Sequence, residues 1–373
     1  MKSILFVLHL PPPVHGASVV GQYIHNSTLV NTTFDCHYVN LTTAASLEDI
    51  GKGGFRKLWI FCKKLWEIRQ AIKKLKPDAV YVTPNSAGFP FYKDFVVVEL
   101  CKWWSGKRLI LHFHNKGVST RQGKRLDDLF YKRFFNGVKV ILLGKPLYGD
   151  VRKYVAEKQV HYCPNGIASH VFSKKDIENE VPHILWLSNI MRSKGLMEYL
   201  DALYLLKSRN ISFHSVFVGG ITPEITEQDF QKAIAERELT ESISYLGRKY
   251  GEEKESCFSQ ADVFVLPSYT EGFPLTILEA MQHGLPVVAT NVGAVNVAIE
   301  NGVNGLLIGS DEPILTLDYK PDSSELADAL QKLIINKSLR KQMGMAGREK
   351  FEREFSLEQF ERLFICTLKE CLS

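Results

Sequence analysis

The stretch from residue 261 to residue 305 constrains the fold of this chain more than any other part of its sequence. Residues 263–266 form a short apolar run, which predicts a buried strand of a parallel sheet. Pro274 suits the start of a helix, Gly284 is a stop signal, and residues 286–290 predict the next strand. A helix N-terminus therefore lies at the carboxyl end of a parallel strand, where anions bind to free amides.

Two carboxylates mark this unit: Glu271 lies on the loop before the helix, and Glu279 lies about two turns inside it. A phosphate bound to the amides of residues 273–276 would leave Glu271 near one end of the ligand and Glu279 near hydroxyls at the other. A nucleotide sugar has this shape. The alternative interpretation is that Glu271 is a solvated loop acid and Glu279 a surface acid, and the two glutamates alone leave both open. Besides Glu271, the predicted ligand-binding residues here are Gly272, Phe273, Pro274, Leu275, Thr276 and Glu279.

The whole stretch resembles the nucleotide-binding half of family 4 glycosyltransferases. The matching motifs are Pro-Ser at 267–268, Glu-Gly-Phe-Pro at 271–274, Glu-Ala-Met at 279–281 and His-Gly-x-Pro-Val-Val at 283–288. Glu271 and Glu279 match the family's Glu-x7-Glu motif. The resemblance implies an α/β chain with the GT-B fold, in which two Rossmann-like parallel-sheet domains face each other across a cleft.

Length and composition suit such a chain. Its 373 residues favour two domains, and 45% apolar with 23% charged residues is typical of a soluble globular protein. We expect an acceptor-side domain at residues 1–178, a nucleotide-sugar domain at 179–355, and a C-terminal helix at 356–373 that packs back on the first domain. The seven cysteines are scattered and never spaced as Cys-x-x-Cys, which favours a reducing, cytoplasmic compartment without zinc or disulfides.

Charge is divided unevenly along the chain. Residues 1–175 hold 27 Lys/Arg against 11 Asp/Glu, whereas residues 176–373 hold 19 against 30. The basic half includes residues 54–76, which predict an amphipathic helix with tryptophans and lysines. One interpretation is a helix that packs on the sheet and has a solvated basic face. The other is contact with an anionic membrane surface, and the two are compatible.

In the first half, two positions are candidates for the site. Gly16 follows the predicted strand at residues 3–8, and it resembles the second glycine of the family's Gly-Gly-Ala-Glu turn, from which His15 and Ser18 depart. The resemblance implies that Gly16 faces the donor diphosphate. His114 follows a predicted strand and matches the family's histidine beside the transferred sugar, although a half-buried structural histidine is an equal alternative.

In the second half, the family's usual Gly-Arg-Leu and Lys-Gly pair is only partly matched. Lys194 keeps the lysine, Asn189 occupies the arginine's place, and Arg192 is a nearby replacement candidate. Gly247 and Arg248 resemble the strand end at which the family's backbone groups hold the nucleobase.

The resemblance implies a retaining glycosyltransferase, and we expect it to use a UDP- or GDP-linked sugar and a hydroxyl of a glycan or polyprenyl-diphosphate-linked acceptor. The resemblance implies that Glu271, His114 and Lys194 are catalytic and that no metal is needed, and the lack of an Asp-x-Asp motif in the chain agrees with the latter. We expect no cofactor. We expect a role in capsule, exopolysaccharide or O-antigen synthesis, a peripheral position on the inner face of the cell membrane, and no nucleic-acid partner. The alternatives are a nucleotide-sugar 2-epimerase and an inactive sugar-binding homologue. A nicotinamide enzyme is disfavoured by the lack of Gly-x-Gly-x-x-Gly after the first strand.

Overall fold

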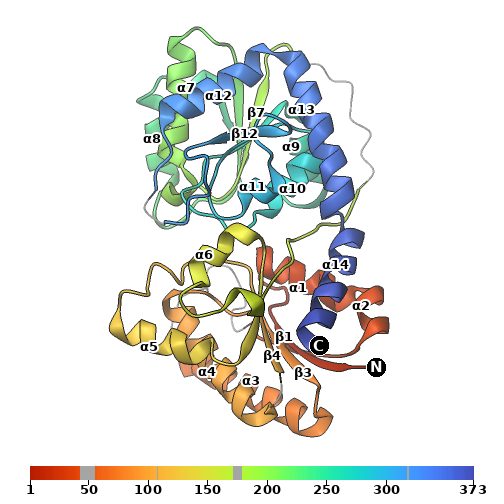
Figure 1. Cartoon of the computed structure of the whole chain (residues 1–373). Coiled ribbons are helices and arrows are strands. Elements are labelled where there is room, and N and C mark those ends of the chain that lie inside the picture. The colour runs from red at the N-terminus through yellow and green to blue at the C-terminus, as the bar shows by residue number, and fades with distance from the viewer. Residues whose placement is uncertain (43–54, 107, 171–178, 317–318) are drawn as a thin grey trace. The chain divides into compact units, whose positions relative to one another are not determined.

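The computed structural model describes residues 1–42, 55–106, 108–170, 179–316 and 319–373 (Figure 1). These residues form two units, Met1–Ile167 with Leu357–Ser373, and Ala168–Ser356. The boundary predicted between residues 178 and 179 adjoins residues 171–178, which lie outside the described residues. Each unit is built around one sheet and is described by itself.

The sheet of the first unit has six parallel strands in the order β2-β1-β3-β4-β5-β6. The strands are β1 (Ser3–Leu8), β2 (Asp35–Asn40), β3 (Ala79–Val82), β4 (Arg108–Phe113), β5 (Val138–Leu142) and β6 (Val160–Tyr162). The inner strands are almost wholly buried, as the apolar runs predicted, because helices cover both faces of the sheet. The edge strands β2 and β6 have mixed polar sequences, so apolar runs did not reveal them.

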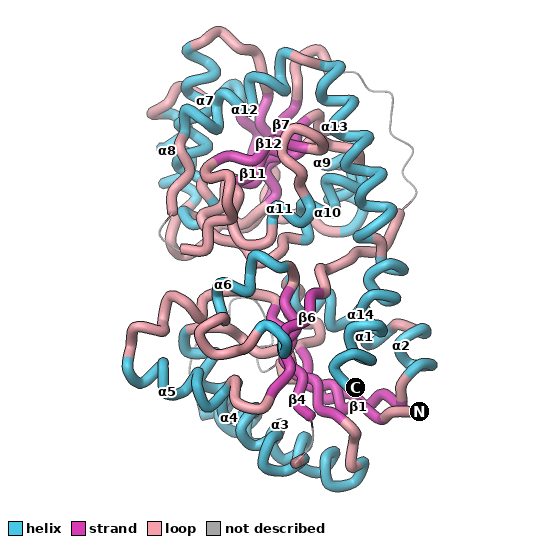
Figure 2. Tube along the Cα trace, viewed as in Figure 1, coloured by secondary structure: helices cyan, strands magenta, loops and turns pink. Residues whose placement is uncertain are grey.

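Two layers of helices cover this sheet (Figures 1 and 2). The helices are α1 (Gly16–Asn26), α2 (Thr28–Thr33), α3 (Phe55–Leu75), α4 (Gly88–Ser105), α5 (Arg125–Phe134), α6 (Tyr148–Val151) and α14 (Leu357–Leu372). Successive side chains of β4 point to opposite faces. The His112 ring lies 6.3 Å from Phe364 of α14, whereas the Phe113 ring lies 6.3 Å from Phe134 of α5. Because α4 packs against α5 through Phe91, and α3 packs against α4, these three helices form the layer opposite α14.

The sheet of the second unit also has six parallel strands, in the order β12-β11-β10-β7-β8-β9. The strands are β7 (His183–Leu187), β8 (His214–Val218), β9 (Ile243–Tyr245), β10 (Val263–Leu266), β11 (Val287–Thr290) and β12 (Gly305–Ile308). The helices are α7 (Leu196–Ser208), α8 (Glu227–Ala235), α9 (Gly251–Gln260), α10 (Leu275–Gln282), α11 (Val295–Ala298), α12 (Ser323–Ile335) and α13 (Lys337–Lys350). Trp186 of β7 forms part of the core, and its ring stacks on Tyr199 of α7 at 5.4 Å.

The return of the C-terminal helix to the first unit confirms that part of the predicted fold. Helix α4 begins at Gly88, directly after the turn that follows β3. Pro90 falls in its first turn, where a proline is tolerated because the missing N–H would have no helical partner. No helix in the described part of the chain is both long and apolar enough to cross a membrane.

Candidate functional site

Ligands of open parallel sheets bind at the carboxyl ends of the strands, where the strand order reverses. In the second unit this point lies between β7 and β10, and in the first unit it lies between β1 and β3. Most predicted site residues follow strands that meet at or beside these two points.

The turn that carries Lys194 is packed against the end of β10. Gly195 has a φ of +77°, and a Cβ there would lie 1.9 Å from the carbonyl oxygen of Pro267, so only glycine fits. The amide of Tyr269 donates a hydrogen bond to the carbonyl of Ser193, at 2.9 Å. These contacts hold the lysine at the switch point.

Glu271 is the partner of this lysine. The Lys194 Nζ lies 2.6 Å from Glu271 Oε1, and the glutamate side chain is only 11% exposed. The loop of Glu271 is held by the turn after β11: the amide of Ala294 donates to the Gly272 carbonyl at 2.9 Å, and a Cβ on Gly293 would lie 2.1 Å from the Glu271 carbonyl oxygen. Two predicted residues, 77 positions apart in sequence, are therefore brought into contact.

Helix α10 begins directly after this loop. Its N-cap is Pro274, which provides no side-chain hydrogen bond to the first turn. Phe273 is buried, and its ring lies 5.5 Å from that of Phe355. The backbone amides of Leu275 and Thr276 belong to the first turn of the helix, where a helix has no carbonyl partners of its own.

Glu279, on the second turn of α10, has a cationic partner that sequence reasoning missed. The Lys254 Nζ of α9 lies 2.7 Å from Glu279 Oε1, and both side chains are half-buried. Burial raises the pKa of the Glu279 carboxyl, and the charge of Lys254 partly opposes that rise. Nothing in the local sequence of Lys254 marks it, because the contact joins two helices.

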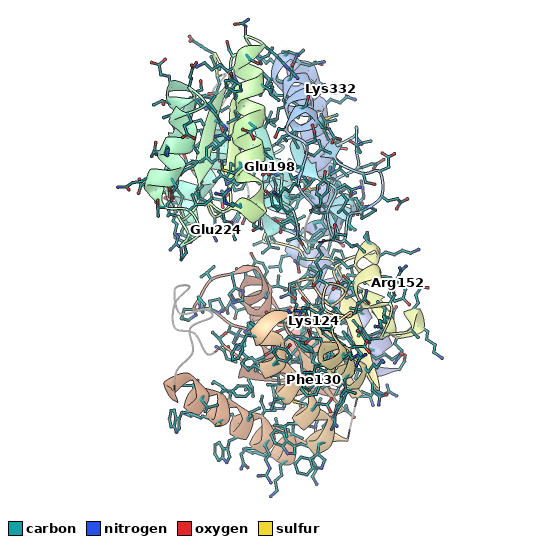
Figure 3. The ribbon with its side chains drawn as sticks, turned by 90° about the vertical axis from the view of Figure 1, so that its left-hand side faces the viewer. Lys124, Phe130, Arg152, Glu198, Glu224 and Lys332 are labelled. Carbon is teal, nitrogen blue, oxygen red and sulfur yellow. The ribbon has the colours of Figure 1, made fainter. Side chains whose placement is uncertain are left out.

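The remaining predicted residues of the second unit are Asn189, Arg192, Gly247 and Arg248. Arg192 is 60% exposed on its side chain, and its Nε lies 3.9 Å from Glu224, which Figure 3 labels. Asn189 is exposed at the end of β7. The Gly247 carbonyl accepts a hydrogen bond from the Gly219 amide at 2.9 Å, at the end of β8. The guanidinium of Arg248 lies against Gly220, where a Cβ would be 2.1 Å from its Nε.

In the first unit, histidines gather at the carboxyl edge of the sheet. His9 follows β1, His15 is the N-cap of α1, and His114 follows β4 as predicted. The His9 and His15 rings are 5.9 Å apart. Burial lowers the pKa of His9 to about 3, assisted by the charge of Lys93, and lowers the pKa of His114 to about 4, against the opposing effect of Asn165. These imidazoles are therefore neutral at neutral pH.

His112 has a structural position. It lies inside β4, is fully buried, and its Nδ1 lies 2.6 Å from the hydroxyl of Tyr81. The His15 and Ser18 substitutions that depart from the family's turn form a capping box: the Ser18 amide donates to His15 Nδ1 at 3.3 Å, and the His15 amide donates to Ser18 Oγ at 2.9 Å. Gly16 is the first residue of α1, and a Cβ there would meet nothing within 4 Å.

In the described ranges, no cluster of three or more His, Cys, Asp or Glu side chains has the geometry of a metal site. The residues at the two switch points instead present cations, carboxylates, neutral imidazoles and helix amides. Such groups bind hydroxyls and phosphates by hydrogen bonds and charge.

Comparison with known proteins gives a family for the second unit. Residues 170–350 match the family described as "Glycosyl transferases group 1". The D-inositol 3-phosphate glycosyltransferase of Paenarthrobacter aurescens is 29% identical over 269 residues, which cover 66% of this chain and 63% of that protein. The capsular polysaccharide biosynthesis glycosyltransferase CapM of Staphylococcus aureus is 28% identical over 192 residues, which cover 50% of this chain and 46% of CapM. The chain thus spans less than two thirds of the length of these relatives.

Solved structures resemble the whole chain. Anabaena HepE, in complex with UDP and glucose, superposes with a TM-score of 0.70 at 17% identity, covering 99% of this chain and all of that one. WaaG, a glycosyltransferase involved in lipopolysaccharide biosynthesis, superposes with a TM-score of 0.68 at 14% identity, covering 98% of this chain and 99% of WaaG. The likeness shows the GT-B fold, with two Rossmann-like domains.

Proposed function

We propose that the chain is a group 1 glycosyl transferase of the family 4 type, and that it transfers a glycosyl group from a nucleotide-diphosphate sugar to a hydroxyl of a glycan or lipid-linked glycan. The observation that carries this proposal is the contact between Lys194 and Glu271 at the switch point of the second sheet. A cation and a carboxylate beside a helix N-terminus suit a ligand that joins a diphosphate to a hydroxyl-rich sugar.

The proposed reaction breaks the bond between the anomeric carbon and the diphosphate oxygen, and forms a bond from that carbon to the acceptor oxygen. The proton of the acceptor hydroxyl leaves with the nucleoside diphosphate, so atoms and charge balance. Negative charge grows on the diphosphate as the sugar departs, and Lys194 with the first-turn amides of α10 stabilises it. Glu271 holds the sugar, and Glu279 holds the ribose.

Retention of the anomeric configuration and independence from metal ions are parts of the same proposal. They rest on the resemblance to family 4, and the second also on the lack of an Asp-x-Asp motif in the sequence. No side chain at the second switch point is an assured nucleophile, which favours attack by the acceptor on the face that the leaving group vacates; a double displacement through an enzyme-bound sugar is the alternative route. Activity in EDTA, and NMR of the early product, test the two parts.

The class of product is proposed from the names of the relatives. CapM is named for capsular polysaccharide biosynthesis and WaaG for lipopolysaccharide biosynthesis, while HepE was solved with UDP and glucose. These names support the UDP-linked form of the UDP- or GDP-linked donor that we propose, and an acceptor on the route to a capsule or a lipopolysaccharide. The excess of Lys/Arg in residues 1–175, 27 against 11 Asp/Glu, supports peripheral binding of the first unit to the inner face of an anionic membrane.

The test begins with a thermal-shift panel of UDP, GDP, UDP-linked and GDP-linked sugars, and NAD⁺. The panel is needed because the side chains of the site do not determine which base and which sugar bind. We expect stabilisation by one nucleotide class and its sugars, and none by NAD⁺. With the donor so chosen, Glu271→Ala should lower turnover by about 10²-fold or more, measured as released nucleoside diphosphate, since the carboxylate acts at the reacting sugar.

The matched control is Glu241→Ala, which removes an exposed carboxylate in front of β9 and should leave turnover unchanged. Turnover of Glu271→Ala equal to that of the control would refute the assignment. Epimerised donor formed without acceptor would identify a 2-epimerase instead.

A further inference from the structure

The outer surface of the α3–α4–α5 layer carries large apolar side chains that face solvent. Phe89 is 79% exposed, Trp103 is 77% exposed and Leu126 is 71% exposed, which is unusual for such side chains in a folded protein. We call the following set the apolar face: Trp59 and Trp66 of α3, Phe89 and Trp103 of α4, and Leu126 and Leu129 of α5.

The apolar face is one surface rather than a scatter of single residues. Trp59 and Trp66 are seven residues apart, two helical turns, and so lie on the same side of α3. Phe89, Val96 and Trp103 repeat at the same spacing along α4, and all three are exposed. Because α3, α4 and α5 cover the same face of the sheet side by side, their outward sides form a continuous layer (Figures 1 and 2).

The charge of this layer is strongly positive. The three helices contain twelve Lys/Arg against five Asp/Glu. The carboxylates are engaged by neighbouring cations: Glu67 by Lys64 at 2.9 Å, and Glu99 by Lys102 at 2.9 Å. The other three carboxylates are also paired: Asp94 with Lys93 at 3.8 Å, Asp127 with Arg121 at 2.8 Å, and Asp128 with Lys132 at 2.7 Å. The exposed cations therefore determine the sign of the surface.

We propose that the apolar face docks on an anionic lipid bilayer, with its aromatic and leucine side chains inserted at the level of the headgroups and its lysines and arginines against lipid phosphates. This rests on the membrane clause of the proposed function and names its surface. Tryptophan and phenylalanine flanked by Lys/Arg are the composition of interfacial segments. A second copy of the chain is a poorer occupant, because two equally positive faces repel each other.

The position of the apolar face also fits a lipid-linked acceptor. Phe89 and Leu126 are in the first turns of α4 and α5, which follow β3 and β4 in the chain. They therefore lie toward the carboxyl edge of the sheet, the edge of His9 and His114. A bilayer on the apolar face leaves that edge open and beside the headgroups, where an acceptor anchored in lipid presents its hydroxyls.

The experiment uses the full chain and vesicles of phosphatidylcholine, with or without phosphatidylglycerol. We expect co-sedimentation with the anionic vesicles only, and quenching of tryptophan fluorescence by brominated acyl chains. Trp186 is fully buried in the second unit and supplies the unquenched reference. The variant Trp59→Ser, Trp66→Ser, Phe89→Ser, Trp103→Ser should bind anionic vesicles about tenfold more weakly or worse, since binding scales with inserted apolar area.

The matched control is Ile335→Ser, Met345→Ser, which removes two apolar side chains that are 66% and 64% exposed on the second unit and should bind as the wild type does. Equal binding by the four-residue variant and the wild type would overturn the proposal, as would binding without bromolipid quenching. A dimer in solution that the variant dissociates would assign the face to a second copy instead. Thermal stabilisation by UDP or GDP is measured on the wild type and on every variant. If neither nucleotide stabilises the wild type, the proposed function is contradicted, whereas the vesicle result remains valid.

Discussion

The two units have the same architecture and opposite chemistry at their carboxyl edges. Both contain a six-stranded parallel sheet with a switch point. The second presents charged pairs there, Lys194 with Glu271 and Lys254 with Glu279. The first presents half-buried histidines, of which His9 and His114 are held neutral by burial. A common fold does not determine the ligand chemistry, because the side chains on the loops after the strands determine it.

Under the proposed function, the difference suits different partners for the two units. Ion pairs that include a half-buried lysine can exchange a carboxylate for a phosphate, which suits a diphosphate. Neutral imidazoles donate and accept hydrogen bonds without charge, which suits sugar hydroxyls. The proposed function therefore places the donor diphosphate on the second unit and hydroxyl groups on the first. Four measurements test this division of ligands between the two units.

The largest effect should come from Lys194→Ala. Asn189 has no charge at the position where the family has arginine, so Lys194 must stabilise the negative charge of the leaving diphosphate. Removal of the Lys194 ammonium group should therefore lower turnover about 10²–10⁴-fold. Released nucleoside diphosphate under saturating donor measures this. Asn189→Arg should be tolerated.

Arg192→Ala is the control for Lys194, since its side chain is 60% exposed and lies near Glu224. If Arg192 shares the work, its removal should cost about tenfold or more; if it is solvated surface, almost nothing. Near-normal turnover of Lys194→Ala, and of the double variant with Arg192→Ala, would show that helix amides alone stabilise the leaving diphosphate. The role proposed for the charged side chains of the second unit would then be wrong.

The next effect should come from Glu279→Ala, which should weaken nucleotide binding by about 1–3 kcal/mol through lost charged hydrogen bonds, with little change in turnover at saturation. Lys254→Met gives a sharper result. Since Lys254 opposes the rise in the Glu279 pKa, its removal should raise that pKa further, so that nucleotide affinity is lost at higher pH as the solution is acidified. Calorimetric titration over a pH series measures both; identical pH profiles for Lys254→Met and wild type would refute the coupling.

Much of this arrangement follows from the sequence, and the rest does not, for physical reasons. Short apolar runs revealed the inner strands, because parallel strands are buried on both faces. Glu271, Lys194 and His114 were found through motifs that lie after such strands. Lys254 was missed because its partner is on another helix, and His9 because a histidine after a strand has no distinctive spacing.

The exposed side chains of α4 were missed for a different reason. Sequence periodicity identifies the buried side of a helix only when the opposite side is polar. Phe89, Val96 and Trp103 are apolar on the side that faces solvent, so this helix has no clear polar face. Only the structure shows which side the sheet covers.

A further effect, in the first unit alone, should appear as a pH dependence of stability. The pKa of His114 is lowered to about 4 and that of His9 to about 3, from an ordinary value of 6.5. The unfolded chain therefore binds more protons below pH 6.5, and stability falls as pH decreases from 6.5 toward 4 for His114 and toward 3 for His9. Each contributes about 1.4 kcal/mol per pH unit inside its window.

Urea unfolding of wild type, His114→Asn and His9→Asn over that pH range measures the contribution, and each variant should show a shallower slope. Asp94, whose pKa is raised by burial, acts in the opposite direction, so only the difference between variant and wild type is diagnostic. Parallel curves for all three proteins would mean that these histidines are not held neutral.

The smallest effect on stability should come from Gly16→Ala, and that makes it the cleanest probe of the first unit's part in donor binding. Gly16 is the first residue of α1, and an added Cβ meets nothing within 4 Å, so the fold does not require glycine there. The free energy of unfolding, measured in urea, should change by less than about 0.5 kcal/mol. By contrast, a Cβ on Gly21 would lie 2.1 Å from the carbonyl oxygen of His9, so Gly21→Ala should destabilise the unit by about 1–3 kcal/mol. If the donor diphosphate approaches the backbone at Gly16, the added methyl group should raise the donor KM while the unfolding curve stays unchanged. An unchanged KM would show that Gly16 is an ordinary turn residue, and donor contacts would then rest on the second unit alone.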